Sequence, residues 1–391
     1  MKIDPNIIKT TPKTLPFAFC TYGEPSEEIL EWIKFWGIQQ VSSGPFTNFV
    51  LPSDLSISEL FLPAKYYKYI DSFSPNLNKR MHMGHLANLI TAKFIQSMGI
   101  GGIYISVLGD TLTGIVSKEY AFSDLQNYCD LFNYHIEEIF FASELKILDE
   151  SILFDGEGEY EGTKIFKVKD QKIVAIKNTG QTTYFYQDVA VAQALDAPTL
   201  YVTGFEQNEH FASLKVLFPH IDHIGMGLVM LDGKKMSSSE GNVIFIEDYI
   251  KQLKKIFDDE KLLWNIIAGS ILGSTINSVK KINTKDILNV KMSAGLYISY
   301  TQAKMWSAGL PYEQTTQFSD PELEFKYLKA KYNLQPNILL SGTVQLCEKI
   351  NKLYEDHRIK DNVENQKMFQ VLVNDLMLAC KYLGLFKIDK V

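Results

Sequence analysis

The sequence predicts an α/β protein in which a doubly wound parallel sheet is followed by an all-helical C-terminal domain. Three observations support this fold class. A turn-rich break at 72–76 is followed by a helical pattern and then by a β-rich run that ends at Leu108. A second short apolar run, 200–204, ends in glycine, and beyond about Leu262 the apolar residues recur at helical spacing. Strands that alternate with helices are typical of a parallel sheet covered on both faces.

The first helix of this domain is expected over 84–98. Apolar residues follow one broad face of the segment, as a helix packed against a core requires: Leu86, Leu89, Ile90, Phe94, Ile95 and Met98. The glycine-rich stretch 99–102 ends the helix, and the β-rich run 103–108 is expected to be a strand.

Later segments define the domain organisation. Charged and apolar residues alternate over 166–176, which predicts a hairpin in an inserted region around 111–180. Apolar clusters near the C-terminus indicate a helical bundle: Phe369, Val371, Leu372, Leu376, Met377, Cys380 and Leu383. We therefore expect a short N-terminal segment at 1–45, a Rossmann-type domain at 46–261 and a helical domain at 262–391.

The bulk composition indicates a soluble globular protein. Hydrophobic residues make up 46% of the 391 residues, and no stretch reaches the ~18 apolar residues that a membrane span needs. The N-terminus has no apolar segment of a signal peptide. The four cysteines lie far apart, which fits neither a disulfide framework nor a zinc site, so we expect a cytoplasmic protein. We also expect a monomer and no metal ion held by protein ligands alone. The net charge of −7 neither supports nor excludes nucleic-acid binding.

The segment His82-Met83-Gly84-His85 lies at the start of the expected helix. Phosphate binds readily at a helix N-terminus because the backbone N–H groups and the dipole both favour negative charge. Imidazoles one turn away can donate hydrogen bonds to phosphate oxygens, and a glycine between them lets a flat base approach the backbone. Taken alone, the segment is equally consistent with two surface histidines near a helix cap.

A second segment, 233–242, combines glycines and serines with two lysines. Small residues suit a mobile loop, hydroxyls bond phosphate, and lysines neutralise a leaving pyrophosphate. Alone, it is more often an exposed charged turn. The chain contains neither G-x-G-x-x-G nor a P-loop, which disfavours hydride-transfer and P-loop enzymes.

Together the two segments resemble the H-I-G-H and K-M-S-K-S signatures of class I aminoacyl-tRNA synthetases. Five segments are similar, in the same order, to motifs of arginyl-tRNA synthetases: SPNLNKRMHMGH (74–85), TYFYQDVA (183–190), YVTGFEQNEHF (201–211), HIGMGLV (223–229) and YISYTQAK (297–304). The resemblance runs from about Gly44 to the C-terminus. It implies activation of an amino acid, arginine in this family, with ATP and Mg²⁺, transfer to tRNA, and an anticodon-binding role for 262–391.

The resemblance also implies a role for individual residues. His82, His85 and Lys235 would stabilise the transition state at the α-phosphate. ATP would be bound by Lys79, Gly84, Met226, Gly227, Ser237 and Ser239. The amino acid would be bound by Asp71, Ser74, Asn76, Tyr184, Asp188, Gln207 and His210, with Asn76 and Gln207 at its α-amino group. The guanidinium would lie against Tyr184, Asp188 and Asp71, the last standing where the family has glutamate. This is chemically reasonable, because a guanidinium taken from water needs carboxylate partners.

The sequence departs from the family at three places. Ser238 stands where K-M-S-K-S has its second lysine, Thr111–Gly114 replaces W-G-T-Q, and the N-terminal segment is short. Two alternatives therefore stay open beside arginine–tRNA ligation. One is a paralogue that passes the activated amino acid to a small molecule, peptide or carrier protein. The other is a catalytically inactive tRNA-binding relic.

Overall fold

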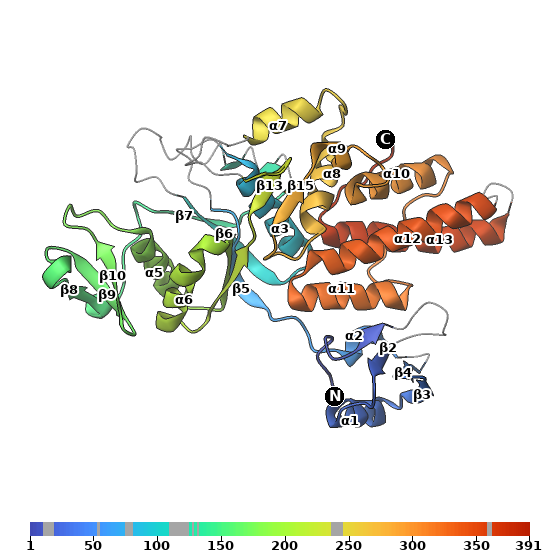
Figure 1. Ribbon diagram of the computed structural model, residues 1–391, viewed down its shortest axis with the longest axis horizontal. Coiled ribbons are helices and arrows are strands. Elements are labelled where there is room, and N and C mark those ends of the chain that lie inside the picture. Colours follow the sequence, from blue (N-terminus) through green and yellow to red (C-terminus); the bar gives the residue numbers. More distant parts are fainter. Residues whose placement is uncertain are drawn as a thin grey trace. The chain divides into compact units, whose positions relative to one another are not determined.

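The computed structural model describes the following residues: 1–10, 19–52, 55–74, 81–108, 125–126, 129–130, 133–235, 245–357 and 362–391. The chain groups into two compact units (Figure 1). Unit 1 comprises residues 1–65, 259–275 and 285–391, and unit 2 comprises residues 66–258 and 276–284.

Unit 2 is built on a parallel sheet. Its described strands lie in the order β12-β11-β5-β6-β7, and every neighbouring pair is parallel. The strands are β5 (Tyr67–Asp71), β6 (Gly101–Leu108), β7 (Glu138–Phe141), β11 (Thr199–Gly204) and β12 (Ile221–Met226). The helices beside them are α3 (Met83–Ser97), α5 (Tyr184–Leu195), η3 (Phe205–Gln207) and α6 (Asn208–Leu217). The helix expected over 84–98, the strand expected over 103–108 and the strand expected over 200–204 are thereby confirmed.

The order in which strands are added to the sheet reverses at β5. The chain proceeds from β5 to β6 and β7 on one side, and then from β11 to β12 on the other. Because parallel crossovers are right-handed, this reversal places α3 and α6 on opposite faces, as Figure 1 shows. The doubly wound fold class is confirmed. The reversal also creates a crevice at the carboxyl ends of β5 and β11, where ligands bind in such sheets.

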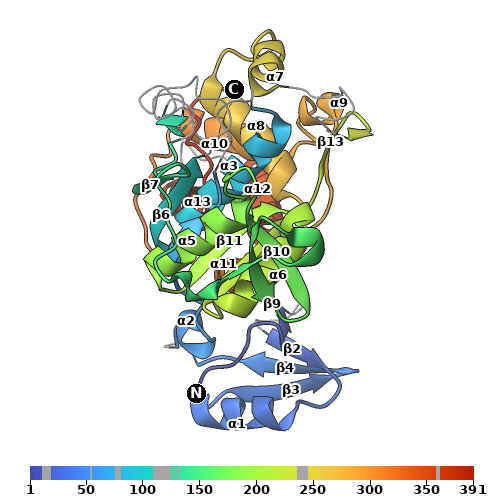
Figure 2. The ribbon, with the colours of Figure 1, turned by 90° about the vertical axis from the view of Figure 1, so that its left-hand side faces the viewer.

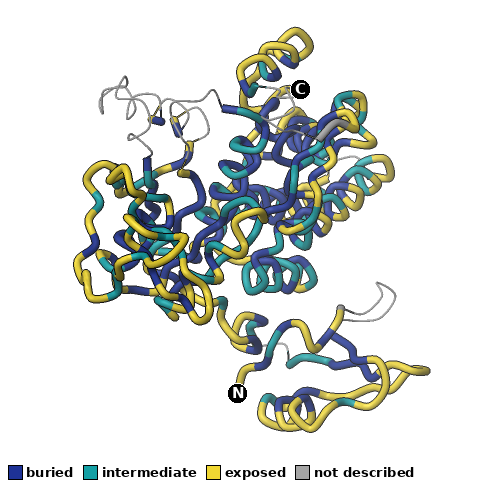
Figure 3. Tube along the Cα trace, turned by 60° about the vertical axis from the view of Figure 1, so that its left-hand side comes forward, coloured by how far each residue is buried: buried dark blue, intermediate teal, exposed yellow. Residues whose placement is uncertain are grey.

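Apolar packing fixes α5 and α6 on one face of the sheet. Phe185 and Val189 of α5 join Tyr201 of β11 and Leu214 of α6 in one buried cluster. In the tube of Figure 3, buried and exposed stretches alternate along the helices, as amphipathic helices require.

Two small sheets complete unit 2. The expected hairpin is present as β9 (Lys164–Val168) and β10 (Gln171–Ile176), which pair antiparallel and continue to β8 (Leu153–Asp155), beside η1 (Glu150–Ile152) and η2 (Gly158–Tyr160). The third sheet has the order β14-β13-β15, with β13 (Val229–Leu231), β14 (Lys234–Lys235) and β15 (Lys280–Ile282). Helix α7 (Ile246–Leu253) follows β14 in the described chain.

The N-terminal part of unit 1 is an antiparallel sheet with two helices. Figure 2 shows β2, β4 and β3 side by side above α1. The elements are β1 (Lys9–Thr10), β2 (Phe19–Tyr22), α1 (Glu27–Trp36), β3 (Gln39–Ser43), β4 (Phe46–Val50) and α2 (Ile57–Leu60). The rings of Trp32, Phe49 and Phe61 form its core, and Phe325 of the helical part packs against Phe19 with ring centroids 4.6 Å apart.

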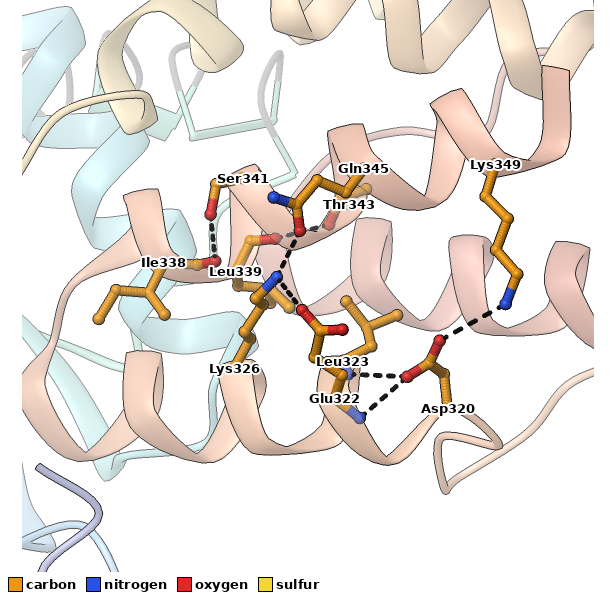
Figure 4. Close-up of polar contacts among 10 residues, drawn as sticks. All are labelled: Asp320, Glu322, Leu323, Lys326, Ile338, Leu339, Ser341, Thr343, Gln345 and Lys349. Carbon is orange, nitrogen blue, oxygen red and sulfur yellow. Dashed lines mark hydrogen bonds and ion pairs between the residues drawn. The ribbon is translucent and has the colours of Figure 1, made fainter. Parts of the chain in front are cut away.

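The remainder of unit 1 is helical, which agrees with the expected helical C-terminal domain. Its helices are α8 (Glu260–Leu272), α10 (Ala294–Ser307), α11 (Pro321–Asn333), α12 (Pro336–Asp356) and α13 (Val363–Leu383). The short α9 (Thr284–Ile287) begins with the last residue of unit 2 in sequence and continues into unit 1. Figure 4 shows the polar contacts of α11. Asp320 caps this helix by accepting from Glu322 N and Leu323 N, and Lys326 binds both Glu322 of the same helix and Gln345 of α12. Among the described residues, no helix is long and apolar enough to span a membrane.

Candidate active site

A cavity of about 820 Å³ opens at the carboxyl ends of the central strands of unit 2. Its walls are formed by the ends of β5, β11 and β12, the first turns of α3 and of α5, and the segment 205–211. This is the position that the reversal of the sheet predicts for a ligand. Eleven of the residues expected at the site line this one cavity: Asp71, Ser74, His82, Gly84, His85, Tyr184, Asp188, Gln207, His210, Met226 and Gly227.

The two histidines of the first motif cap α3 with their own side chains. His82 Nδ1 accepts from Gly84 N at 3.1 Å, and His85 Nδ1 accepts from His82 N at 3.1 Å. This reciprocal pattern is a capping box in which imidazoles replace the usual hydroxyl and carboxylate. Because both Nδ1 atoms accept, the neutral rings carry their protons on Nε2. The rings stack with centroids 4.0 Å apart, so the two donors are held as a pair.

Gly84 is required by this cap. A Cβ atom at Gly84 would lie 2.9 Å from Cε1 and 3.0 Å from Nδ1 of His82. Any larger residue would therefore push the His82 ring away from the hydrogen bond that begins the helix.

The same cavity is also lined by two carboxylates, those of Asp71 and Asp188, which we call the acidic wall. Asp71, at the end of β5, is only 4% exposed, and Ser74 Oγ donates to its Oδ1 at 2.6 Å. Ser74 Oγ in turn accepts from Val107 N at 2.8 Å, which fixes the hydroxyl. Burial raises the pKa of Asp71 to about 7, and the charge of Asp188 adds to this, while hydrogen bonds from Ser74 and Phe73 oppose it.

Asp188 and Tyr184 lie one turn apart on α5, as expected from their spacing. Thr183 caps this helix by accepting from Tyr186 N at 3.3 Å, which sets where α5 begins. Asp188 Oδ2 is 2.6 Å from His210 Nε2 of α6. Tyr184 is 57% exposed at the cavity wall, whereas the Asp188 side chain is 18% exposed.

Met226 and Gly227 form the wall at the end of β12. Thr91 of α3 donates its hydroxyl to Met226 Sδ at 3.3 Å. Gly227 N donates to Ile276 O at 3.0 Å, and a Cβ at Gly227 would lie 1.9 Å from Ser278 O. Only glycine fits here, because the chain at 276–278 passes directly over it.

The chain on both sides of the lysine segment belongs to the same region. Lys235 lies in β14, whose partner β13 begins at Val229, a residue of the cavity wall. On the other side, Phe245 forms a β-bridge with His82, and Ile246 N donates to Met81 O at 3.0 Å. The described residues that precede the segment therefore pair with a strand that begins at the cavity wall, and those that follow it contact the histidine motif.

Several expected residues lie outside the described residues: Asn76, Lys79, Ser237 and Ser239, together with the departures at Thr111–Gly114 and Ser238. For Lys235 only the backbone is described.

Other residues of the cavity wall were missed by the sequence analysis. Asn88 lies one turn after His85 on α3, and that spacing could have revealed it. Glu206 lies within a quoted motif, next to Gln207. Tyr201 reaches the cavity because it is the register partner of Asp71 in the neighbouring strand, which local sequence does not show.

Comparison with known proteins agrees with the resemblance seen in the sequence. No family model matches the chain. The "Arginine--tRNA ligase" of Limosilactobacillus reuteri (strain DSM 20016) is 27% identical over 240 residues, which cover 50% of this chain and 42% of that protein. The chain thus spans less than half the length of this curated relative. The "Arginine--tRNA ligase" of Lactobacillus johnsonii is 22% identical over 489 aligned positions, covering 90% of this chain and 87% of that protein.

Solved structures show the same fold. The arginyl-tRNA synthetase of Thermus thermophilus superposes with a TM-score of 0.66 at 13% identity, over 98% of this chain and 96% of that one. The arginyl-tRNA synthetase of Plasmodium falciparum gives a TM-score of 0.62 at 17% identity, over 90% of this chain and 86% of that one. In sequence and in fold, the chain is arginyl-tRNA synthetase-like.

Proposed function

We propose that this arginyl-tRNA synthetase-like chain activates L-arginine with ATP as arginyl-adenylate and transfers the arginyl group to tRNA. One observation carries the proposal: a single cavity is lined both by a pair of imidazole donors at a helix N-terminus and by the carboxylates of Asp71 and Asp188. The first feature suits a nucleotide phosphate, and the second suits a cationic side chain.

The acidic wall fits a guanidinium better than a neutral side chain. A buried carboxylate that meets no cation or hydrogen-bond donor loses its hydration without compensation. Asp188, held by His210 through Oδ2, keeps Oδ1 as an acceptor. A site that relies on such polar partners rejects amino acids that lack them by roughly 10⁴-fold. We assign Tyr184, Asp188 and Asp71 to the guanidinium, Ser74 to holding Asp71, and Gln207 and Asn76 to the α-amino group.

The reaction requires positioning and charge stabilisation, not a protein nucleophile. A carboxylate oxygen of arginine attacks the α-phosphorus of ATP, and the bond from this phosphorus to the oxygen of the leaving pyrophosphate breaks. Charge grows on the phosphate oxygens in the transition state, where the Nε2–H groups of His82 and His85 and the ammonium of Lys235 would stabilise it. Met226 and Gly227 would border the adenine.

Mg²⁺ would enter with the phosphates of ATP. Within the described part of the chain, no group of three or more histidine, cysteine or acidic side chains is arranged to hold a metal ion. Phosphate oxygens and water commonly supply most ligands of Mg²⁺ in nucleotide sites. In this proposal the helical part of unit 1 contacts the tRNA.

The test is aminoacylation with ATP, labelled arginine and total tRNA, alongside a panel of other amino acids. Acid-precipitable arginine that depends on tRNA supports the proposal. Arginine-dependent pyrophosphate exchange without tRNA, but no charging of tRNA, would instead favour a different acceptor. If neither reaction occurs with folded protein and His85→Ala changes nothing, the chain is a relic without this chemistry.

A further inference from the structure

Tyr201 is a residue of the cavity wall whose buried hydroxyl the proposed roles leave unused. It lies in β11 as the register partner of Asp71 in β5 and of His223 in β12, so the three side chains share one face of the sheet. Tyr201 lines the cavity and is 1% exposed. Its hydroxyl is buried and has no hydrogen-bond partner among the described residues.

The ring of Tyr201 is fixed in this position. Phe211 of α6 packs against it with ring centroids 4.7 Å apart, and Phe211 in turn stacks on His223 at 4.5 Å. Burial, reinforced by the negative charges of Asp188 and Asp71, holds the pKa of Tyr201 well above its ordinary value. The phenol is therefore neutral, and it can both donate and accept a hydrogen bond.

A buried hydroxyl without a partner destabilises the folded protein, so such groups need an explanation in the ligand or in water. Here the hydroxyl belongs to a residue of the cavity wall, close enough to both carboxylates to feel their charge. A guanidinium between these carboxylates presents five N–H donors in one plane, more than two carboxylates in fixed positions readily satisfy.

Building on the proposed function, we propose that Tyr201 is a specificity-determining residue whose hydroxyl oxygen accepts an N–H of the bound arginine guanidinium. The phenol is neutral, so the contact adds no uncompensated charge. The ligand-free protein carries the cost of the orphaned hydroxyl, and binding of arginine removes it.

The experiment compares Tyr201→Phe with wild type and with Tyr249→Phe, a buried tyrosine on α7 that does not line the cavity. Arginine binding is measured by titration calorimetry, the KM for ATP by aminoacylation, and stability by the thermal midpoint of the ligand-free protein. Removing an acceptor from a charged donor weakens arginine binding by about tenfold or more. The KM for ATP stays within about twofold, and the midpoint is unchanged or rises because an orphaned polar atom is gone.

Weaker arginine binding together with an unchanged or higher thermal midpoint distinguishes a ligand contact of Tyr201 from a purely structural role. If Tyr201→Phe binds arginine as tightly as wild type does, the contact proposed for the Tyr201 hydroxyl is overturned, while the proposed function stands. A lower midpoint accompanied by equal losses for arginine and ATP would also overturn it, since that pattern marks a packing residue. If wild-type protein binds no arginine, the proposed function fails and this inference fails with it.

Discussion

Asp188→Asn tests the charge of the acidic wall with little change in shape. Asp188 is 18% exposed on its side chain and lies 2.6 Å from His210, so its charge acts in a largely dry setting. In the proposed complex Asp188 pairs with the guanidinium of arginine, and breaking a buried charge pair by removing one partner costs about 3–5 kcal/mol. Because Asp188 keeps some contact with water, we take the lower figure of about 3 kcal/mol, which corresponds to a loss of about 10²-fold in kcat/KM for arginine.

Asp222→Asn is the matched control. Asp222 lies 2.6 Å from Lys215 in an ion pair, and its side chain is 21% exposed, but it does not line the cavity. Steady-state aminoacylation of both variants, with arginine and ATP varied separately, gives the comparison. The reasoning is refuted if Asp222→Asn loses as much kcat/KM for arginine, or if the defect of Asp188→Asn lies in the KM for ATP.

Three further predictions follow from the same geometry. The KM for arginine should rise as pH falls below about 7, because burial raises the pKa of Asp71 to about 7 and a protonated Asp71 cannot pair with a cation. The contribution of Asp71 to folding stability has the opposite trend: it is full below about pH 4 and is lost as pH rises through about 7. Asp71→Asn should abolish both trends, in pH-dependent kinetics and in thermal melts. His85→Ala should lower kcat by about 10²–10³-fold and cost about 1 kcal/mol of stability through the lost cap, whereas a loss confined to the thermal midpoint would exclude a role at the phosphate. Gly227→Ala should destabilise the protein by about 1–3 kcal/mol in denaturant titrations, since its Cβ would lie 1.9 Å from Ser278 O; an unchanged midpoint would show that the chain at 276–278 does not press on Gly227.

Local patterns in the sequence were sufficient to predict much of unit 2. The helix expected over 84–98 is present at Met83–Ser97, because its apolar residues repeat at the spacing of one helix face. The alternation over 166–176 likewise identified a hairpin. In contrast, the elements of the first 65 residues were not foreseen: all residues of β3 (Gln39–Ser43) are exposed, so the strand shows no apolar alternation.

The same distinction applies to the site. The motifs identified His82 and His85 because both lie within one turn of one helix. The pairing of Asp188 with His210 depends on how α5 packs beside α6, and the closeness of Tyr201 to Asp71 depends on strand register. Neither relation leaves a local pattern in the sequence, because each is set by contacts between distant segments.

The pairing of β5 with β11 also determines when the site can form during folding. The register partners Asp71 and Tyr201 are roughly 130 residues apart along the chain, so a large loop must close before they meet. Contacts of such long range slow folding, and parallel strands are assembled late for the same reason. A nascent chain that has not yet released residues 199–204 lacks one wall of the candidate site, so the amino-acid recognition proposed above requires that this strand has first joined the sheet.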